Sequence, residues 1–245
     1  MKNIVIIPAR YGSSRFPGKP LACILNKPMI QWVYERASKS RSISEVYIAT
    51  DDKRIYSAVE EFDGNVIMTG MCNCGTERIY QASLDIDCDI IINVQGDEPT
   101  IHPEQIDLIV RAFTDKEIQM VTLKQKIISE SELNDPNIVK VITDSDGNAV
   151  YFSRWPIPYD RQKKYTPDNY YKHIGIYGYR KKFLQTFVNL PISKMESMES
   201  LEQLRVIEYG YKIKVLETEY ESIGVDLKGQ IPLAEEILRK DMNNQ

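Results

Sequence analysis

The sequence predicts an α/β fold of the Rossmann-like kind, with a mostly parallel sheet, helices on both faces and an inserted mixed-sheet lobe. Short apolar runs such as Ile4–Ile7 and Asp89–Val94 have the length and composition of buried strands. Between them, apolar residues recur at helical spacing, as at Ile30, Val33 and Ala37. This alternation favours parallel strands, because each connection must cross the sheet as a helix.

The first half of the chain repeats this alternation several times. Pro28 and Pro103 suit the first turn of a helix, and the pair Asp51-Asp52 can cap another. The expected strands are Ile4–Ile7, Val46–Ala49, Val66–Met68 and Asp89–Val94. The expected helices begin at Pro28, after Asp52, at Gly75 (to Leu84) and at Pro103.

The second half has a different pattern, with more strands in succession. Residues Asp144 to Asn148 contain the Asp, Gly and Asn of a hairpin turn. The expected strands are Met120–Lys126, Val139–Asp144, Ala149–Arg154, His173–Tyr179 and Ile213–Leu216. One expected helix follows the strand His173–Tyr179 and continues through Phe187. The others are Glu199–Tyr209, ended by Gly210, and Ile231–Arg239. We expect one α/β domain, residues 1–245, with the lobe at about residues 120–190.

Composition excludes several classes of protein. The chain has 245 residues, 42% of them hydrophobic, and a net charge of −4, whereas a nucleic-acid-binding protein usually has a basic excess. No stretch approaches the roughly 20 apolar residues of a membrane span, and the start lacks a signal-peptide pattern. We therefore expect a cytoplasmic protein with no nucleic-acid or membrane partner. Cys72 and Cys74 form a C-x-C pair, but with only two histidines in the chain a zinc site is disfavoured.

The loop after the first strand concentrates positive charge. Residues 6–20 read I-I-P-A-R-Y-G-S-S-R-F-P-G-K-P, so Arg10, Arg15 and Lys19 stand among Gly and Ser. Such a loop can bring backbone N–H groups and cations against a polyphosphate. The alternative is a solvated basic turn. On an acidic protein, the local cations favour a small anionic ligand.

Carboxylates follow other expected strands. Asp97 comes after a buried strand, and Asp226 follows the short apolar segment Ile223–Val225. Each could instead cap a helix. Because ligands of parallel sheets bind at the carboxyl ends of strands, we expect the basic loop, Asp51-Asp52 and Asp97 to share one site. There, two carboxylates could hold Mg²⁺ on the phosphates of a nucleotide.

Together these motifs resemble a known family. In order, they are I-I-P-A-R-Y-G-S-S-R-F-P-G-K-P, A-T-D-D, G-T-E-R, N-V-Q-G-D-E-P, Y-F-S-R, H-I-G-I-Y-G-Y-R, E-S-L-E-Q-L-R and G-V-D. The chain is similar over nearly its whole length to CMP-Kdo synthetases, the 3-deoxy-manno-octulosonate cytidylyltransferases. The resemblance implies a nucleotidyltransferase-type fold and an enzyme that couples CTP to a sugar acid, most simply Kdo. The anomeric hydroxyl attacks the α-phosphate, and CMP-sugar and pyrophosphate form.

The resemblance also implies roles for individual residues. Lys19, Arg15 and Asp97 would be catalytic, and Mg²⁺, the implied cofactor, would be held by Asp97 and Asp226. Nucleotide binding would fall to Pro8, Ala9, Arg10, Ser14, Arg15, Lys19, Arg78 and Gln95. Sugar binding would fall to Arg154, His173, Tyr177, Glu202 and Gln203. The family further implies a homodimer formed through the lobe.

The sequence departs from the family pattern at three places. Cys72 and Cys74 stand where the family usually has His and Ser, and thiols are poor hydrogen-bond partners. Residues 227–230, L-K-G-Q, replace the usual T-P-E-D, so the last helix loses its proline start and acidic first turn. Trp155 could reshape the sugar pocket. A modified ulosonic acid therefore remains a possible substrate.

Other interpretations are open. The loop lacks G-x-G-x-x-G, and Gly18-Lys19 is followed by Pro20, which disfavours a Rossmann oxidoreductase and a P-loop NTPase. A nucleotide sensor without catalysis, or a sugar nucleotidyltransferase using UTP or GTP, would keep the basic loop. Without the resemblance, Arg154 could pair with a surface acid, His173 and Tyr177 could be structural, and Glu202 and Gln203 could form a solvated helix face.

Overall fold

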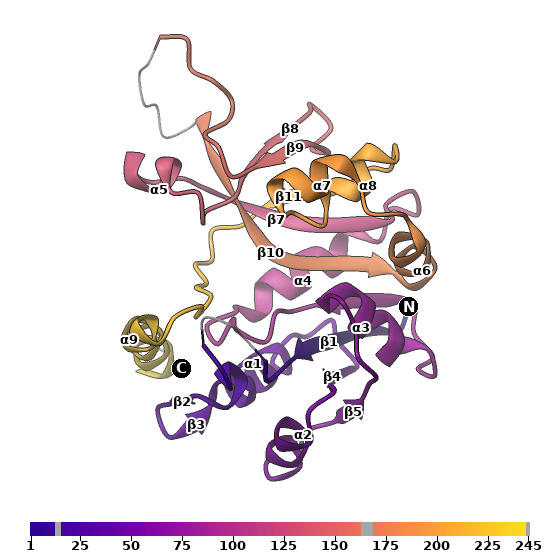
Figure 1. Cartoon of the computed structure of the whole chain (residues 1–245), viewed down its shortest axis with the longest axis vertical. Helices are drawn as coiled ribbons and strands as arrows, with labels where there is room; N and C mark the ends of the chain where they lie inside the picture. Colours follow the sequence, from indigo (N-terminus) through magenta and orange to yellow (C-terminus); the bar gives the residue numbers. More distant parts are fainter. Residues whose placement is uncertain (13–15, 163–168, 244–245) are drawn as a thin grey trace. The chain divides into compact units, whose positions relative to one another are not determined.

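The computed structural model describes residues 1–12, 16–162 and 169–243, so the predicted site residues Ser14 and Arg15 lie outside the described residues. The chain divides into two compact units. The first unit comprises Met1–Val110 and Tyr220–Gln245, and the second comprises Arg111–Glu219. Figure 1 shows the helices and strands of both units.

The first unit is built on a parallel sheet with the strand order β6-β1-β4-β5. Within β1, Ile4 to Ile7 are completely buried, as expected for a strand with both faces covered. Val5 is paired with Val46 on one side and Ile92 on the other. The strands are β1 (Asn3–Ala9), β4 (Glu45–Thr50), β5 (Val66–Met68) and β6 (Ile90–Asn93).

Helices connect these strands, and their first turns use the caps that the sequence predicts. Pro28 precedes α1, and the Asp52 carboxylate accepts a hydrogen bond of 2.9 Å from the Arg54 amide at the start of α2. The helices are α1 (Met29–Ala37), α2 (Lys53–Glu60), α3 (Gly75–Ser83), α4 (Pro103–Ala112) and α9 (Ile231–Asn243). Three short elements were not predicted from the sequence: η1 (Lys19–Leu21) and the paired strands β2 (Cys23–Ile24) and β3 (Lys27–Pro28).

The C-terminal helix α9 packs on the first unit. Its residues Ala234 and Leu238 are buried against a cluster that includes Met29 and Trp32. The first turn of α9 has no acid, as the sequence indicates. Instead the Gln230 Oε1 atom, in the preceding 3₁₀ turn η3 (Lys228–Gln230), accepts hydrogen bonds from the backbone amides of residues 226 and 227.

The second unit contains a mixed sheet. Strand β7 pairs in parallel with β11 and antiparallel with β10, and β8 pairs with β10 and β9. The predicted hairpin between β8 and β9 is present, with Gly147 at φ 77° in its turn. The strands are β7 (Met120–Lys126), β8 (Lys140–Thr143), β9 (Ala149–Ser153), β10 (Tyr171–Arg180) and β11 (Lys214–Glu217).

One predicted helix of the second unit is wrong. The single helix expected over Glu199–Tyr209 is two helices, because α7 ends at Glu199 and Ser200 has a left-handed φ of 53°. A capping box between Ser193 and Glu196 starts α7 earlier than the apolar spacing indicates. The helices are α5 (Glu130–Asn134), α6 (Lys181–Asn189), α7 (Lys194–Glu199) and α8 (Leu204–Glu208).

The predicted α/β fold with helices and a mostly parallel main sheet is confirmed. The organisation as one domain, 1–245, with a lobe at about 120–190 stays a prediction. In the described part of the chain, no helix is both long enough and apolar enough to cross a membrane.

Candidate active site

A cavity of about 410 Å³ lies in the first unit, at the carboxyl ends of β1 and β6. Parallel sheets bind ligands at this edge. Its lining combines cations, carboxylates and the first turn of α3. The lining residues are Pro8, Ala9, Arg10, Lys19, Pro20, Cys72, Asn73, Cys74, Gly75, Arg78, Gln95, Gly96, Asp97 and Asp226.

The end of β1 and the loop after β6 approach each other closely in this cavity. A Cβ atom on Gly96 would lie 2.8 Å from the backbone oxygen of Pro8, so only glycine fits without a shift. Further along the loop, the Gly18 amide donates to the Tyr11 carbonyl at 2.9 Å, and Gly18 has a φ of 70°. These contacts hold Lys19 at the cavity.

Lys19 lies between the two carboxylates predicted to hold metal. Its Nζ atom is 2.5 Å from Asp97 Oδ2 and 3.1 Å from Asp226 Oδ1. The Lys19 side chain is only 14% exposed, so this is a partly desolvated contact and stronger than a surface ion pair. The structure therefore brings together, around one ammonium, three residues that are far apart in the chain.

Asp226 reaches Asp97 through a backbone contact. The Val225 amide donates a hydrogen bond of 2.8 Å to the Asp97 carbonyl, so the segment ending in Asp226 runs beside the loop after β6. Val225 is completely buried and part of the core beneath α9. The position of Asp226 thus depends on packing of the C-terminal segment.

Glu98 adds a third acid, which was not among the predicted site residues. Burial, and then the charge of Asp97, raise the pKa of Glu98 to about 7. In the described part of the chain, Glu98 Oε2 and Ser222 Oγ are buried side-chain atoms without a hydrogen-bond partner. A strongly acidic corner therefore adjoins the cations of the cavity. The signal for it was the acidic pair in Q-G-D-E-P.

The first turn of α3 contributes Arg78, whose guanidinium is bound by two side chains from outside this helix. Its Nη2 atom is 2.7 Å from Asp51 Oδ2, its Nη1 atom is 2.5 Å from Thr69 Oγ1, and the residue is 4% exposed. Asp51 was expected at the site because it follows β4, and its contribution there is to hold the guanidinium of Arg78. The guanidinium has two of its five N–H donors bound by these side chains.

The two cysteines that depart from the family pattern both line the cavity. Cys74 is the N-cap of α3, and its thiol accepts from the Glu77 amide at 3.4 Å. The Cys72 Sγ atom is 3.3 Å from Gln81 Oε1. Burial raises the pKa of the Cys72 thiol, so it is a neutral, weak donor at pH 7. The helix cap survives the replacement of the family's usual residue.

The predicted sugar-binding residues all belong to the second unit. The rings of His173 and Tyr177, both on β10, have centroids 5.3 Å apart. Burial and the charge of Glu202 raise the pKa of Tyr177, and burial lowers the pKa of His173 to about 3. Both Glu202 and Gln203 were expected within a helix. Instead, Glu202 lies in the turn before α8, and Gln203 is the N-cap of α8. His173, Tyr177 and Glu202 form one group.

The guanidinium of Arg154 donates hydrogen bonds to backbone carbonyls. Its Nε atom donates to Glu199 O at 2.8 Å and its Nη1 atom to Pro136 O at 3.0 Å. Its own carbonyl accepts from Lys140 Nζ at 2.6 Å. Lys140 is completely buried on β8, and it also donates to the carbonyls of Asp135 and Ile138. Lys140 was not among the predicted site residues, and its only signal in the sequence is a charge inside an apolar strand.

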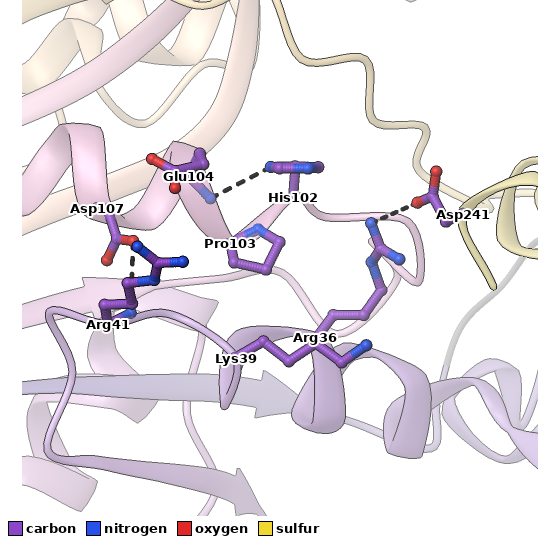
Figure 2. Close-up of a pocket in the computed structure, with 8 residues that line it drawn as sticks. All are labelled: Arg36, Lys39, Arg41, His102, Pro103, Glu104, Asp107 and Asp241. Carbon is purple, nitrogen blue, oxygen red and sulfur yellow. Dashed lines mark hydrogen bonds and ion pairs between the residues drawn. The ribbon is translucent and has the colours of Figure 1, made fainter. Parts of the chain in front are cut away.

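A second cavity, of about 460 Å³, lies elsewhere in the first unit (Figure 2). Its charged groups bind the protein itself. Arg36 pairs with Asp241 at 2.8 Å, and Asp107 accepts from the Ser42 amide at 3.0 Å. The His102 ring stacks on Tyr220 with centroids 3.9 Å apart. Positive and negative side chains are balanced here, so the first cavity is the better site for an anionic ligand.

The described residues do not form a closed metal cage. Among them, no group of three or more His, Cys, Asp or Glu side chains could hold a metal ion. Asp97 and Asp226 are two oxygen donors on one cation, so any metal would need further ligands from a substrate.

A sheet edge with cations and paired acids around one cavity suits the phosphates of a nucleotide, as in an α/β nucleotidyltransferase. Residues 4–214 match the cytidylyltransferase family. A 3-deoxy-manno-octulosonate cytidylyltransferase from Thermodesulfovibrio yellowstonii is 49% identical, with 97% of this chain and 98% of that protein covered. The 8-amino-3,8-dideoxy-manno-octulosonate cytidylyltransferase of Shewanella halifaxensis is also 49% identical, with 98% of this chain and 100% of that protein covered.

Solved structures agree. The structure of a CMP:2-keto-3-deoxy-manno-octonic acid synthetase complexed with CTP has a TM-score of 0.92 and 42% identity, over 98% of this chain and 100% of that one. A 4-diphosphocytidyl-2C-methyl-D-erythritol synthase from Anaerococcus prevotii, 16% identical with a TM-score of 0.64, shares the fold. The chain belongs to the cytidylyltransferase family of the 3-deoxy-manno-octulosonate type, and the predicted resemblance is confirmed.

Proposed function

We propose that this enzyme transfers CMP from CTP to the anomeric hydroxyl of a 3-deoxy-ulosonic acid, most simply Kdo. The hydroxyl oxygen forms a bond to the α-phosphorus, the bond from that phosphorus to the β-phosphate bridge breaks, and pyrophosphate leaves. The hydroxyl proton passes to solvent. The observation that carries the proposal is the cavity that gathers Arg10, Lys19, Asp97 and Asp226, in a chain 49% identical to enzymes named for this reaction.

Different residues of the cavity bind different parts of the nucleotide. Arg10 is exposed at the cavity and can bind phosphate oxygens with its planar guanidinium. Lys19 supplies a compact charge for the α-phosphate as negative charge develops there. Pro8, Ala9 and Gln95, at the ends of β1 and β6, are placed to border cytosine and ribose. Arg15 and Ser14 keep their predicted phosphate-binding roles.

Asp97 and Asp226 suit Mg²⁺. This ion prefers oxygen ligands and is commonly held by one or two carboxylates together with substrate phosphates. A single cation, the Lys19 ammonium, already lies between these carboxylates, so the donor geometry accepts positive charge. When bound, the ion would neutralise phosphate charge and favour departure of pyrophosphate. The metal and the Lys19 ammonium compete for the same two carboxylates.

The identity of the sugar acid is open between two candidates. Relatives named for Kdo and relatives named for its 8-amino analogue are equally similar, at 49% identity. His173, Tyr177, Glu202 and Gln203 offer ring, hydroxyl, carboxylate and amide groups for sugar hydroxyls. Arg154 retains N–H donors for a carboxylate besides those that bind backbone oxygens.

The test is pyrophosphate release from purified enzyme with CTP, Mg²⁺ and one sugar acid at a time. Kdo and the 8-amino analogue should give turnover, with kcat/KM deciding between them. Replacing CTP by UTP or GTP should abolish turnover, and Asp97→Asn should lower kcat at least about a hundredfold. Asp85→Asn, an exposed acid beyond α3, is the matched control and should leave the rate unchanged. CTP binding without turnover on either sugar would instead indicate a nucleotide sensor.

Assembly and location remain predictions. We expect a homodimer, and the exposed Trp155 (75%) and Val150 (49%) of the second unit offer apolar surface for one. Sedimentation equilibrium of the purified chain should give twice the monomer mass. A cytoplasmic location would be tested by fractionation of the source cells.

A further inference from the structure

A buried hydroxyl in the second unit contacts one of the proposed sugar-binding residues. Thr122, near the middle of β7, is completely buried. Its Oγ1 atom lies 2.9 Å from His173 Nε2, 2.8 Å from the carbonyl oxygen of Ile176 and 3.2 Å from that of Ile174.

The backbone around Thr122 explains why two carbonyls face one hydroxyl. The pairing of β10 with β7 shifts register between Ile174 and Tyr177, and Tyr177 lies opposite Thr122. A β-bulge of this kind leaves ladder groups without their usual partner. Here the side chain of Thr122 supplies the missing donor.

Proton counting then decides the direction of each hydrogen bond. A hydroxyl has one hydrogen to donate, whereas carbonyl oxygens can only accept. If Thr122 donated to His173, its oxygen would face the Ile176 carbonyl at 2.8 Å with no hydrogen between them. The favourable arrangement is that Thr122 donates to Ile176 and accepts from His173. His173 therefore carries its hydrogen on Nε2.

The surroundings of His173 favour a neutral ring. Phe152 meets it edge-on with centroids 5.0 Å apart, and Tyr177 lies at 5.3 Å. Burial lowers the pKa of His173 to about 3. In a neutral imidazole with a hydrogen on Nε2, the Nδ1 atom is an acceptor. Among the described residues, Nδ1 has no hydrogen-bond partner.

We propose that Thr122 is a positioning residue that fixes the Nε2–H tautomer of His173, so that Nδ1 accepts a hydrogen bond from a hydroxyl of the sugar acid. The inference rests on the proposed function for its ligand. Towards the sugar it assigns His173 Nδ1 an accepting role, which discriminates in favour of a hydroxyl and against a carboxylate at that position, because a carboxylate offers no hydrogen.

The tautomer is measured by ¹⁵N NMR of the ligand-free full chain labelled on histidine. The chain has only two histidines, and His102→Asn assigns their signals. In the wild type at pH 7, His173 should show a protonated Nε2 and an unprotonated Nδ1. Thr122→Val, of similar size, should give a mixture of tautomers, and Thr122→Ser should retain the wild-type pattern. A wild-type ring protonated on Nδ1, or an unchanged ring in Thr122→Val, overturns the proposal.

Kinetics supply the second readout. Thr122→Val should raise KM for the sugar acid about tenfold, the effect of one misdirected hydrogen bond, with KM for CTP unchanged. Thr122→Ser should restore it, and Thr186→Val on α6 is the matched control. An unchanged sugar KM alongside a changed tautomer refutes the role of Nδ1. If the wild type uses no sugar acid, the proposed function fails, whereas the NMR result still decides the tautomer. Should Thr122→Val not fold, the wild-type and Thr122→Ser spectra decide it.

Discussion

Lys140→Met removes three hydrogen-bond donors at one buried point. The Lys140 ammonium donates to the carbonyls of Asp135, Ile138 and Arg154 at 2.9, 2.6 and 2.6 Å. A buried carbonyl left without a donor costs about 1–3 kcal/mol, so three cost several. Part is recovered, because burial lowers the pKa of Lys140 and methionine avoids that desolvation. We expect a net loss of about 3 kcal/mol in the free energy of unfolding.

Urea denaturation of both proteins measures this difference, with the slope m checked for equality. Lys124→Met is the matched control. Lys124 is partly buried in the same sheet, and its ammonium donates one hydrogen bond, to Thr143 Oγ1 at 3.0 Å. It should lose only about 1 kcal/mol. If Lys140→Met lost no more than Lys124→Met, the argument that Lys140 holds the Arg154 segment by three carbonyls would be wrong.

Three further substitutions test the site. Asp97→Asn should lower kcat at least about a hundredfold while changing CTP affinity much less, as turnover and isothermal titration would show; near wild-type turnover with Mg²⁺ present excludes the metal role. Gly96→Ala should destabilise by about 1–3 kcal/mol because its Cβ would meet the Pro8 oxygen at 2.8 Å; an unchanged melting temperature contradicts this. His173 needs its neutral form in the fold, so wild-type stability should fall as pH drops from 6.5 towards 3, by about 1.4 kcal/mol per pH unit; His173→Gln should flatten this fall, and parallel curves would refute it.

Much of the fold follows from local pattern. The run Ile4–Ile7 is apolar at every position and short, which favours a strand buried on both faces, and the structure shows this. Asp52 caps α2 because a short acidic side chain before an amphipathic segment has few better partners. The exception is Glu199–Tyr209, where apolar spacing favoured one helix but the Ser193–Glu196 capping box and the left-handed Ser200 make two.

Some features of the candidate site could likewise be predicted from the sequence, and others could not. The ends of β1 and β6 could be placed together from the sequence, since parallel strands present their carboxyl ends at one edge. The sequence could not predict that Asp51 and Thr69 bind Arg78. It also could not predict that Arg154 donates to backbone oxygens. Such contacts depend on side-chain directions across elements distant in the chain, which periodicity does not encode.

By itself, the sequence determined most of the longer strands and helices, the loops that carry charge, and the family to which the chain belongs, because these depend on neighbouring residues. Only the tertiary structure decided that the Val225 amide meets the Asp97 carbonyl, which carries Asp226 to within 3.1 Å of Lys19. It also decided that a β-bulge turns the Thr122 hydroxyl towards His173. Both depend on register and packing between distant segments, where a shift of one residue would send each side chain elsewhere.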